Sequence, residues 1–206
     1  MDKLSRKGFT LVELLVVIAI LAIIITLSFG GYSMYVRYAK SSRCHDKIKQ
    51  VETAIMSLKT NTGWNPELIA GCANGEGLLD KNVAAVFARN GDKLTQSHTG
   101  SGSSVKLTGE DRFGVVTIWA EEYIEANKNA NLSDKLPGGG SIKDHIFRYA
   151  IDKTGRGTTR VLIGGKAVTV RKSAAVWCCG PNGEFEPYGE AGSDDIYSWT
   201  EEQVVE

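Results

Sequence analysis

The sequence has little proline, little cysteine and no excess of charge of either sign. Of its 206 residues, 4 are proline and 4 are cysteine. So few cysteines exclude a fold held mainly by disulfides, and the spacing of Cys44, Cys72, Cys178 and Cys179 matches no zinc motif. The 24 basic and 24 acidic residues cancel, so no strong field attracts nucleic acid, and no nucleic-acid partner is expected. The hydrophobic share of 42% is enough for one folded domain with an attached element.

Catalytic motifs are also missing from the sequence. Its three histidines, His45, His98 and His145, are scattered, and neither H-E-x-x-H nor G-x-S-x-G occurs. The glycine-rich strings GSGSS and GRGTT lack the strand and helix context of a phosphate-binding loop, and we interpret them as turns. We therefore do not expect an enzyme. The alternative function, a membrane-anchored hydrolase, is disfavoured because these motifs are missing.

The apolar residues are concentrated near the N-terminus. Residues 1–8, MDKLSRKG, carry Lys3, Arg6 and Lys7, and 21 almost wholly apolar residues follow from Phe9 to Phe29. As a helix this run would be about 32 Å long, the thickness of a bilayer's hydrocarbon core. The basic cluster predicts that the N-terminus stays in the cytoplasm. No small-residue cleavage site ends the run, so a simple signal anchor is the plain alternative.

One acidic residue, Glu13, interrupts this apolar run. An ionised side chain there costs several kcal/mol unless it is paired or faces protein, so Glu13 is a functional candidate that needs a partner. Cleavage between Gly8 and Phe9 would create an amino group four residues before Glu13. That cationic terminus, in the same molecule or in a neighbouring copy, could neutralise the carboxylate.

The string K-G-F-T-L-V-E-L-L, residues 7–15, resembles the leader of type IV pilins and type II secretion pseudopilins. The resemblance implies that a prepilin peptidase removes residues 1–8, cutting after Gly8, and methylates the amine of Phe9. It also implies that residues 9–31 form a transmembrane and filament-core helix, with Glu13 pairing to the next subunit's terminus. An inner-membrane assembly platform and its ATPase are the implied partners. Many relatives carry a proline where this chain has Gly30-Gly31, and the two glycines allow a local bend or melt.

Residues 32–62 continue the helix as an amphipathic half, so the whole helix is expected from about residue 10 to 61. Tyr32, Tyr35 and Tyr38 open this half, and they are either interfacial anchors or rings that stack between subunits. Further on, apolar residues recur at intervals of four and three and form a narrow stripe: Cys44, Ile48, Val51, Ile55 and Leu58. This stripe predicts packing against a soluble head.

Residues 63–206 form that head. Its first part, 63–144, is a loop region with two expected helices, at 78–89 and 111–128. In residues 145–179 apolar residues recur at every second position, which predicts a small antiparallel sheet. Its expected strands are 147–151, 159–163, 167–171 and 174–178. The sheet's apolar face would cover the stripe on the long helix. The expected fold class is α+β, a pilin fold with a long N-terminal helix on a small antiparallel sheet.

The C-terminal loop, residues 180–206, contains the string GPNGEFEPYGEAGSDDIYSW. It resembles the calcium-binding loop of the major pseudopilin of type II secretion systems. Asp194, Asp195 and Asn182, with loop carbonyls, would supply the oxygen ligands that calcium prefers. This chain departs from the family pattern at Asn182 and Ser193. The alternative is an acidic surface loop ordered by the packing of Trp199 and by ordinary hydrogen bonds.

The cysteines have a possible role if the head lies outside the cytoplasm, where disulfides persist. Adjacent Cys178 and Cys179 do not suit a bond to each other and would point to opposite faces of a strand. We expect at least one bridge among these two, Cys44 and Cys72, with the connectivity open. Free buried thiols are the alternative.

The sequence thus predicts a structural subunit anchored by one span in the inner membrane, with its head in the periplasm or outside. We favour the pseudopilus of a type II protein secretion system, a homopolymer with minor pseudopilins as partners. A type IV pilin acting in adhesion, motility or DNA uptake is the alternative. A subunit specialised for binding at the filament tip is less favoured, because tip subunits of one group often lack the acid found here at Glu13.

Overall fold

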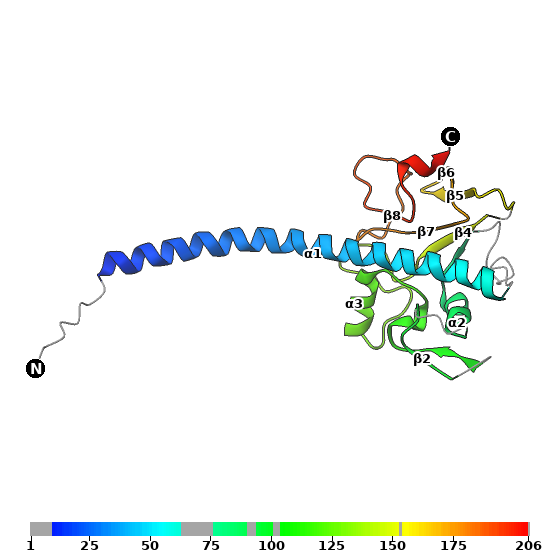
Figure 1. The fold of residues 1–206 in the computed structure, drawn as a ribbon. Helices are drawn as coiled ribbons and strands as arrows, with labels where there is room; N and C mark the ends of the chain where they lie inside the picture. The colour runs from blue at the N-terminus through cyan, green and yellow to red at the C-terminus, as the bar shows by residue number, and fades with distance from the viewer. Residues whose placement is uncertain (1–9, 63–75, 90–93, 101–103, 153, 206) are drawn as a thin grey trace, which may run out of the picture. The chain divides into compact units, whose positions relative to one another are not determined.

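The computed structural model describes residues 10–62, 76–89, 94–100, 104–152 and 154–205, except for the side chains of residues 27–31, 59, 61, 62 and 76. The chain divides into two compact units, Met1–Ala39 and Lys40–Glu206. Helix α1, Leu11–Thr62, contributes to both units (Figure 1).

Helix α1 has 52 residues and confirms the helix expected from about residue 10 to 61. The helix assignment runs through Gly30 and Gly31 without a break. Each glycine costs about 1 kcal/mol relative to alanine, and the 52-residue helix tolerates that penalty. The local melt that the two glycines allowed is therefore not found.

The stripe on the second half of α1 is buried as predicted. Its five residues are at most 2% exposed: Cys44, Ile48, Val51, Ile55 and Leu58. They share one hydrophobic core with Tyr149, Ile151 and Val176 of the sheet and with Phe87. The apolar period of three and four thus marks the face of α1 on which the head folds.

The head contains two principal antiparallel sheets. One has the strand order β1-β4-β7-β8, formed by Glu76–Leu78, Arg148–Ile151, Ala174–Cys178 and Ile196–Tyr197. The other has the order β5-β6-β9, formed by Thr159–Ile163, Lys166–Val170 and Val204–Val205. A short ribbon pairs β2, His98–Thr99, with β3, Lys106–Leu107.

The expectation of one small sheet is wrong, although its four strands lie where the sequence placed them. The hairpin β5–β6 belongs to a separate sheet that covers the far face of β4 and β7. All five residues of β7 are buried, so this strand needs a cover on both faces. Val176 and Cys178 face the core with α1, whereas Ala175 and Trp177 lie in a second core with β5 and β6.

The helices of the head are shorter than predicted. Helix α2 spans Lys81–Arg89, and the preceding Leu78 ends β1 instead of starting the helix. The helix expected at 111–128 is two elements, the 3₁₀ helix η4, Gly109–Phe113, and α3, Ile118–Ala126. Gly114 separates them at a φ of 118°, where an added Cβ would lie 2.2 Å from the carbonyl oxygen of Leu79. Only glycine fits this close approach.

The C-terminal loop carries more structure than the sequence indicated. It contains β8 and β9 and the 3₁₀ helix η5, Glu201–Gln203, which Thr200 and Gln203 close with a capping box. Strand β8 pairs with β7, and β9 pairs with β6. The C-terminal part of the loop is therefore attached to both sheets, and residues 180–195 connect β7 to β8.

Candidate functional site

The first candidate site lies at the start of α1, where Glu13 is part of a helix cap. The backbone nitrogen and the hydroxyl of Thr10 donate to Glu13 Oε2 at 2.8 and 2.9 Å, and the Glu13 nitrogen donates to Thr10 Oγ1 at 3.2 Å. This reciprocal pattern is a capping box, which satisfies backbone donors at a helix N-terminus. Sequence reasoning missed it, although T-L-V-E is the expected signature.

The apolar side chains that follow Glu13 are exposed in the single chain. From Leu11, at 81%, to Val17, at 46%, and onward to Ile25, at 54%, the large residues have no cover. Such a continuous apolar surface is unfavourable in water and marks a surface for other apolar groups. Tyr32, Tyr35 and Tyr38 are also 68–75% exposed, which is compatible with both of their predicted roles.

Among the helices that the structure describes, none is long and apolar enough to cross a membrane. Gly8 and Phe9, the predicted cleavage and methylation positions, lie outside the described residues.

The second candidate site is an acidic cluster in the C-terminal loop. One carboxylate oxygen from each of Glu186, Asp194 and Asp195 lies within 4.8 Å of the other two. Oδ1 of Asp194 and Oδ1 of Asp195 are buried without a hydrogen-bond partner. Buried acceptors are normally satisfied, so these two oxygens are the atoms that a bound cation could contact.

Asn182 has a different place in this cluster from the one predicted. Its amide nitrogen donates to Glu186 Oε1 at 2.6 Å, and its Oδ1 accepts from the Glu184 nitrogen at 2.8 Å. The amide nitrogen of Asn182 therefore positions Glu186. Glu186 is the residue that sequence reasoning missed, because the family resemblance drew attention to the end of the loop.

The electrostatics of the cluster are those of crowded carboxylates. Burial raises the pKa of Asp195 to about 7, and the nearby charges of Glu186 and Asp194 add to the increase. Burial, followed by the charge of Glu186, also raises the pKa of Asp194. Three acids held this close repel one another when ionised, and a bound cation would remove the repulsion.

The donor set fits a hard divalent cation. It consists of carboxylate oxygens, which calcium prefers among protein ligands. It contains neither sulfur nor imidazole among the clustered residues, so zinc and copper are poorly matched.

The fold brings the acids together through close backbone packing. An added Cβ on Gly180 would lie 2.2 Å from Asp194 Oδ1, and one on Gly139 would lie 2.2 Å from the Asn182 carbonyl oxygen. The glycine loop 138–140 thus fits directly against residues 181–183. On the other side, Trp199 is buried, with its ring centroid 6.1 Å from Trp177 and 5.0 Å from Tyr197. The predicted packing of Trp199 is confirmed.

The described cysteines are free buried thiols. Cys44 lies on α1, Cys178 ends β7, and Cys179 follows it. Cys72 lies outside the described residues. As predicted for adjacent residues, the two thiols point apart: Cys178 lies in the core with Cys44, whereas Cys179 Sγ donates to the Asp144 carbonyl oxygen at 3.3 Å.

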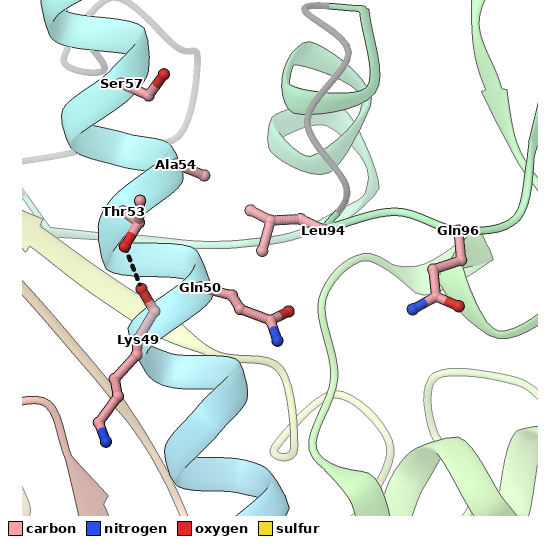
Figure 2. A pocket seen from close by; sticks show the side chains of 7 residues that line it. All are labelled: Lys49, Gln50, Thr53, Ala54, Ser57, Leu94 and Gln96. Atoms are coloured by element: carbon pink, nitrogen blue, oxygen red, sulfur yellow. Dashed lines mark hydrogen bonds between the residues drawn. The ribbon is translucent and has the colours of Figure 1, made fainter.

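A groove of about 570 Å³ runs beside α1 in the head (Figure 2). Its described lining consists of Lys49, Gln50, Thr53, Ala54, Ser57, Leu94 and Gln96. Figure 2 shows Leu94 pointing towards α1, with the amides of Gln50 and Gln96 at the same opening. These lining residues include no histidine, cysteine or carboxylate.

Comparison with known proteins agrees with the N-terminal site. Residues 3–29 match the family described as the prokaryotic N-terminal methylation motif. The type IV major fimbrial protein FimA of Dichelobacter nodosus is 28% identical over 134 residues, which cover 64% of this chain and 82% of that protein. A fimbrial protein of Neisseria meningitidis serogroup A is 28% identical, with the same coverage of 64% and 82%. The type IV major alpha-pilin of Moraxella bovis is 27% identical, covering 61% and 74%. No solved structure matches the chain.

These comparisons show that the chain is similar to type IV pilins, through the methylation motif and, at 27–28% identity, over 61–64% of its length.

Proposed function

We propose that this protein is a subunit of a helical filament that assembles through α1, after a prepilin peptidase has cut between Gly8 and Phe9. The observation that carries the proposal is the exposed apolar surface of α1 with one acid, Glu13, at its start. Before assembly, lipid of the inner membrane covers this surface, with the head outside the cytoplasm. After assembly, the helices of neighbouring copies cover it.

Glu13 has two roles in this proposal. It caps its own helix through Thr10, and it pairs with the methylated amine of a neighbouring subunit. A carboxylate offers about four acceptor positions, so the two roles are compatible. They are also separable, because glutamine can replace glutamate in a capping box but carries no charge.

Three variants test these roles. Glu13→Gln keeps the cap and removes the charge, Thr10→Ala removes the cap and keeps the charge, and Glu13→Ala removes both. We expect all three to be cut after Gly8, as read by mass spectrometry of the mature N-terminus. Filament yield, measured by electron microscopy, should be lost in both Glu13 variants and largely kept in Thr10→Ala. Normal filaments from Glu13→Gln would contradict the charge-pairing role.

The leader is tested separately with Gly8→Val. A branched side chain at the cut position should leave an uncut precursor, retained in the membrane and unable to assemble. If this variant matures and forms filaments, the proposed processing is wrong.

The more specific proposal is that the filament is the pseudopilus of a type II secretion system. The acidic C-terminal loop with Glu186, Asp194 and Asp195 supports it, because that loop resembles the one in the major pseudopilin. In this role a short filament, with minor pseudopilins, an assembly platform and its ATPase, pushes folded cargo through an outer-membrane channel.

A surface pilus is the second candidate, and the similarity to fimbrial proteins favours it. Deletion of the gene separates the two candidates. A pseudopilus predicts that a secreted protein accumulates in the periplasm, whereas a pilus predicts that surface filaments disappear while secretion continues. If the deletion changes neither secretion nor the surface filaments, the filament proposal itself is contradicted.

We also propose that the acidic cluster binds calcium, with Glu186, Asp194 and Asp195 as ligands and Asn182 holding Glu186. The mature protein in detergent, first treated with EDTA, should gain several degrees in melting temperature when millimolar calcium is added, because a ligand of the folded state stabilises it. Asp195→Asn should abolish most of the gain. Glu190→Gln, an exposed residue of the same loop, is the matched control. An unchanged melting temperature in the wild type would exclude a stabilising site.

A further inference from the structure

Two cysteines that are 134 positions apart in the sequence meet in the core of the head. Cys44 on α1 is 1% exposed, and Cys178 at the end of β7 is fully buried. Both belong to the core between α1 and the sheet β1-β4-β7-β8. Their thiols are hydrogen-bonded to each other. Two cysteine side chains in such contact can be joined by a disulfide.

The surroundings make the two thiols unequal. The hydrogen bond with Cys178 lowers the pKa of Cys44, despite burial, and the positive charges of Lys47 and Arg43 add to the effect. Burial raises the pKa of Cys178, and the hydrogen bond with Cys44 raises it further. Each thiol thus acts on the other in the folded head, which places the two side chains next to each other.

Cys179 is excluded as the partner by its own contacts. Its thiol lies 3.5 Å from His145 Nδ1 and donates to the Asp144 carbonyl oxygen, away from Cys44. The thiol of Cys178 therefore faces α1, whereas the thiol of Cys179 lies beside the buried His145.

We propose that Cys44 and Cys178 form a disulfide that fastens α1 to β7. The proposal rests on the proposed position of the head outside the cytoplasm, where disulfides persist. The oxidant is a protein or small-molecule disulfide. The two cysteine thiols together lose two protons and two electrons and become one S–S bond, while the oxidant's disulfide accepts them and becomes two thiols. Because both thiols are buried, the exchange takes place before α1 has packed onto the sheet.

The bond would strengthen the joint between the assembly helix and the head. Force applied to α1 during filament growth reaches the head through core packing and ion pairs, and a covalent link at residue 44 would keep α1 in register with β7. Because the link closes a long loop, it also removes much conformational freedom from the unfolded chain.

Peptide mapping under non-reducing conditions tests the pairing. Cleavage after lysine and arginine places the cysteines in three peptides, 44–47, 60–81 and 173–206. Mature protein isolated from its native membrane, alkylated and digested, should show 44–47 joined to 173–206. In Cys179→Ala the second peptide keeps one cysteine, so a persisting link identifies Cys178. A link from 44–47 to 60–81, or three alkylated peptides without a link, would overturn the proposal.

A second arm separates the pairing from the location of the head. The full-length mature chain is unfolded, reduced and refolded in detergent with glutathione disulfide, or with reduced glutathione alone. We expect the link only in the first sample, with a melting temperature about 10 °C above the second. Refolded protein without the link overturns the pairing. If the link forms in refolded protein but is absent from native protein, the disulfide does not form in the cell. The proposed location of the head is then wrong, but the pairing of Cys44 with Cys178 is correct.

Discussion

The two halves of α1 differ in whether their apolar residues are buried within the single chain. From Leu11 to Ile25 the large apolar side chains are exposed all round the helix, as Leu11 at 81% and Ile18 at 57% illustrate. Beyond Lys40 the apolar residues form a narrow stripe that is at most 2% exposed, as at Val51 and Ile55. The first half needs a cover from lipid or from other copies, whereas the second half finds its cover in its own chain.

The polar residues of the two halves differ in the same way. The first half carries a single acid, Glu13, which is bonded to its own helix turn. The second half forms ion pairs with the head, from Lys40 to Glu122, from Lys47 to Glu121 and from Glu52 to Lys172. One continuous helix thus joins a surface for assembly to a surface for folding.

The largest expected effect comes from a charge placed in each half. Val51→Asp buries an unpaired carboxylate in the core and should destabilise the head by about 4 kcal/mol or more. Ile18→Asp is the matched change on the exposed surface. It should leave the melting temperature of the detergent-solubilised protein unchanged and abolish filament formation. A similar loss of melting temperature in both variants would contradict the comparison.

Lys47 gives the next largest effect. Its amine is paired with Glu121 and donates to the Val116 carbonyl oxygen at 2.9 Å, and burial lowers its pKa. Lys47→Met leaves Glu121 without its cation and should reduce the free energy of unfolding by about 2–3 kcal/mol in denaturant titration. Adding Glu121→Leu should recover most of the loss. If the double variant is as unstable as the single one, the ion pair is not the cause.

The acidic loop gives a smaller, pH-dependent effect. The pKa of Asp195 is about 7 when folded and near 4 when unfolded. The cation-free folded state therefore binds the proton more tightly, and stability should fall as pH rises from about 4 to 7. In EDTA, the melting temperature of the wild type relative to Asp195→Asn should be a few degrees higher at pH 5 than at pH 7.5. Calcium should reverse this trend, because it binds the ionised carboxylates. A difference between the two proteins that does not vary with pH would contradict the raised pKa.

The smallest effect is expected at the exposed ion pair. The Lys40 and Glu122 side chains are 25% and 45% exposed, so water screens their attraction. Lys40→Met should change the free energy of unfolding by less than about 1 kcal/mol. A loss as large as that of Lys47→Met would show that this pair also holds the head to α1.

Much of the fold could be predicted from local patterns. The stripe from Cys44 to Leu58 has the helix period, and residues 159–163 and 166–170 flank a Gly164-Gly165 turn with positive φ at both glycines. These signals depend on neighbours a few residues apart. The helix expected at 111–128 was wrong because Gly114 approaches Leu79, a contact that no local pattern reveals.

The candidate sites also contain some residues that local sequence revealed and others that only the fold revealed. Glu13 is conspicuous in the sequence because it is the one acid in an apolar run, but its partner within the chain, Thr10, was missed. Asp194 and Asp195 were predicted through a family resemblance, whereas Glu186 joins them only because Asn182 and the glycine loop 138–140 fold the segment back. The calcium site and the processing positions Gly8 and Phe9 stay predictions.

The sequence by itself determined the long helix, the apolar run and the acid within it, because helix period and hydrophobicity act over short distances along the chain. Only the tertiary structure decided that β4 and β7 are covered on both faces, that Glu186 completes the acidic cluster and that Cys44 meets Cys178. Those contacts join residues far apart in sequence. Their energy comes from burial and close packing, which exist only once the whole head has folded.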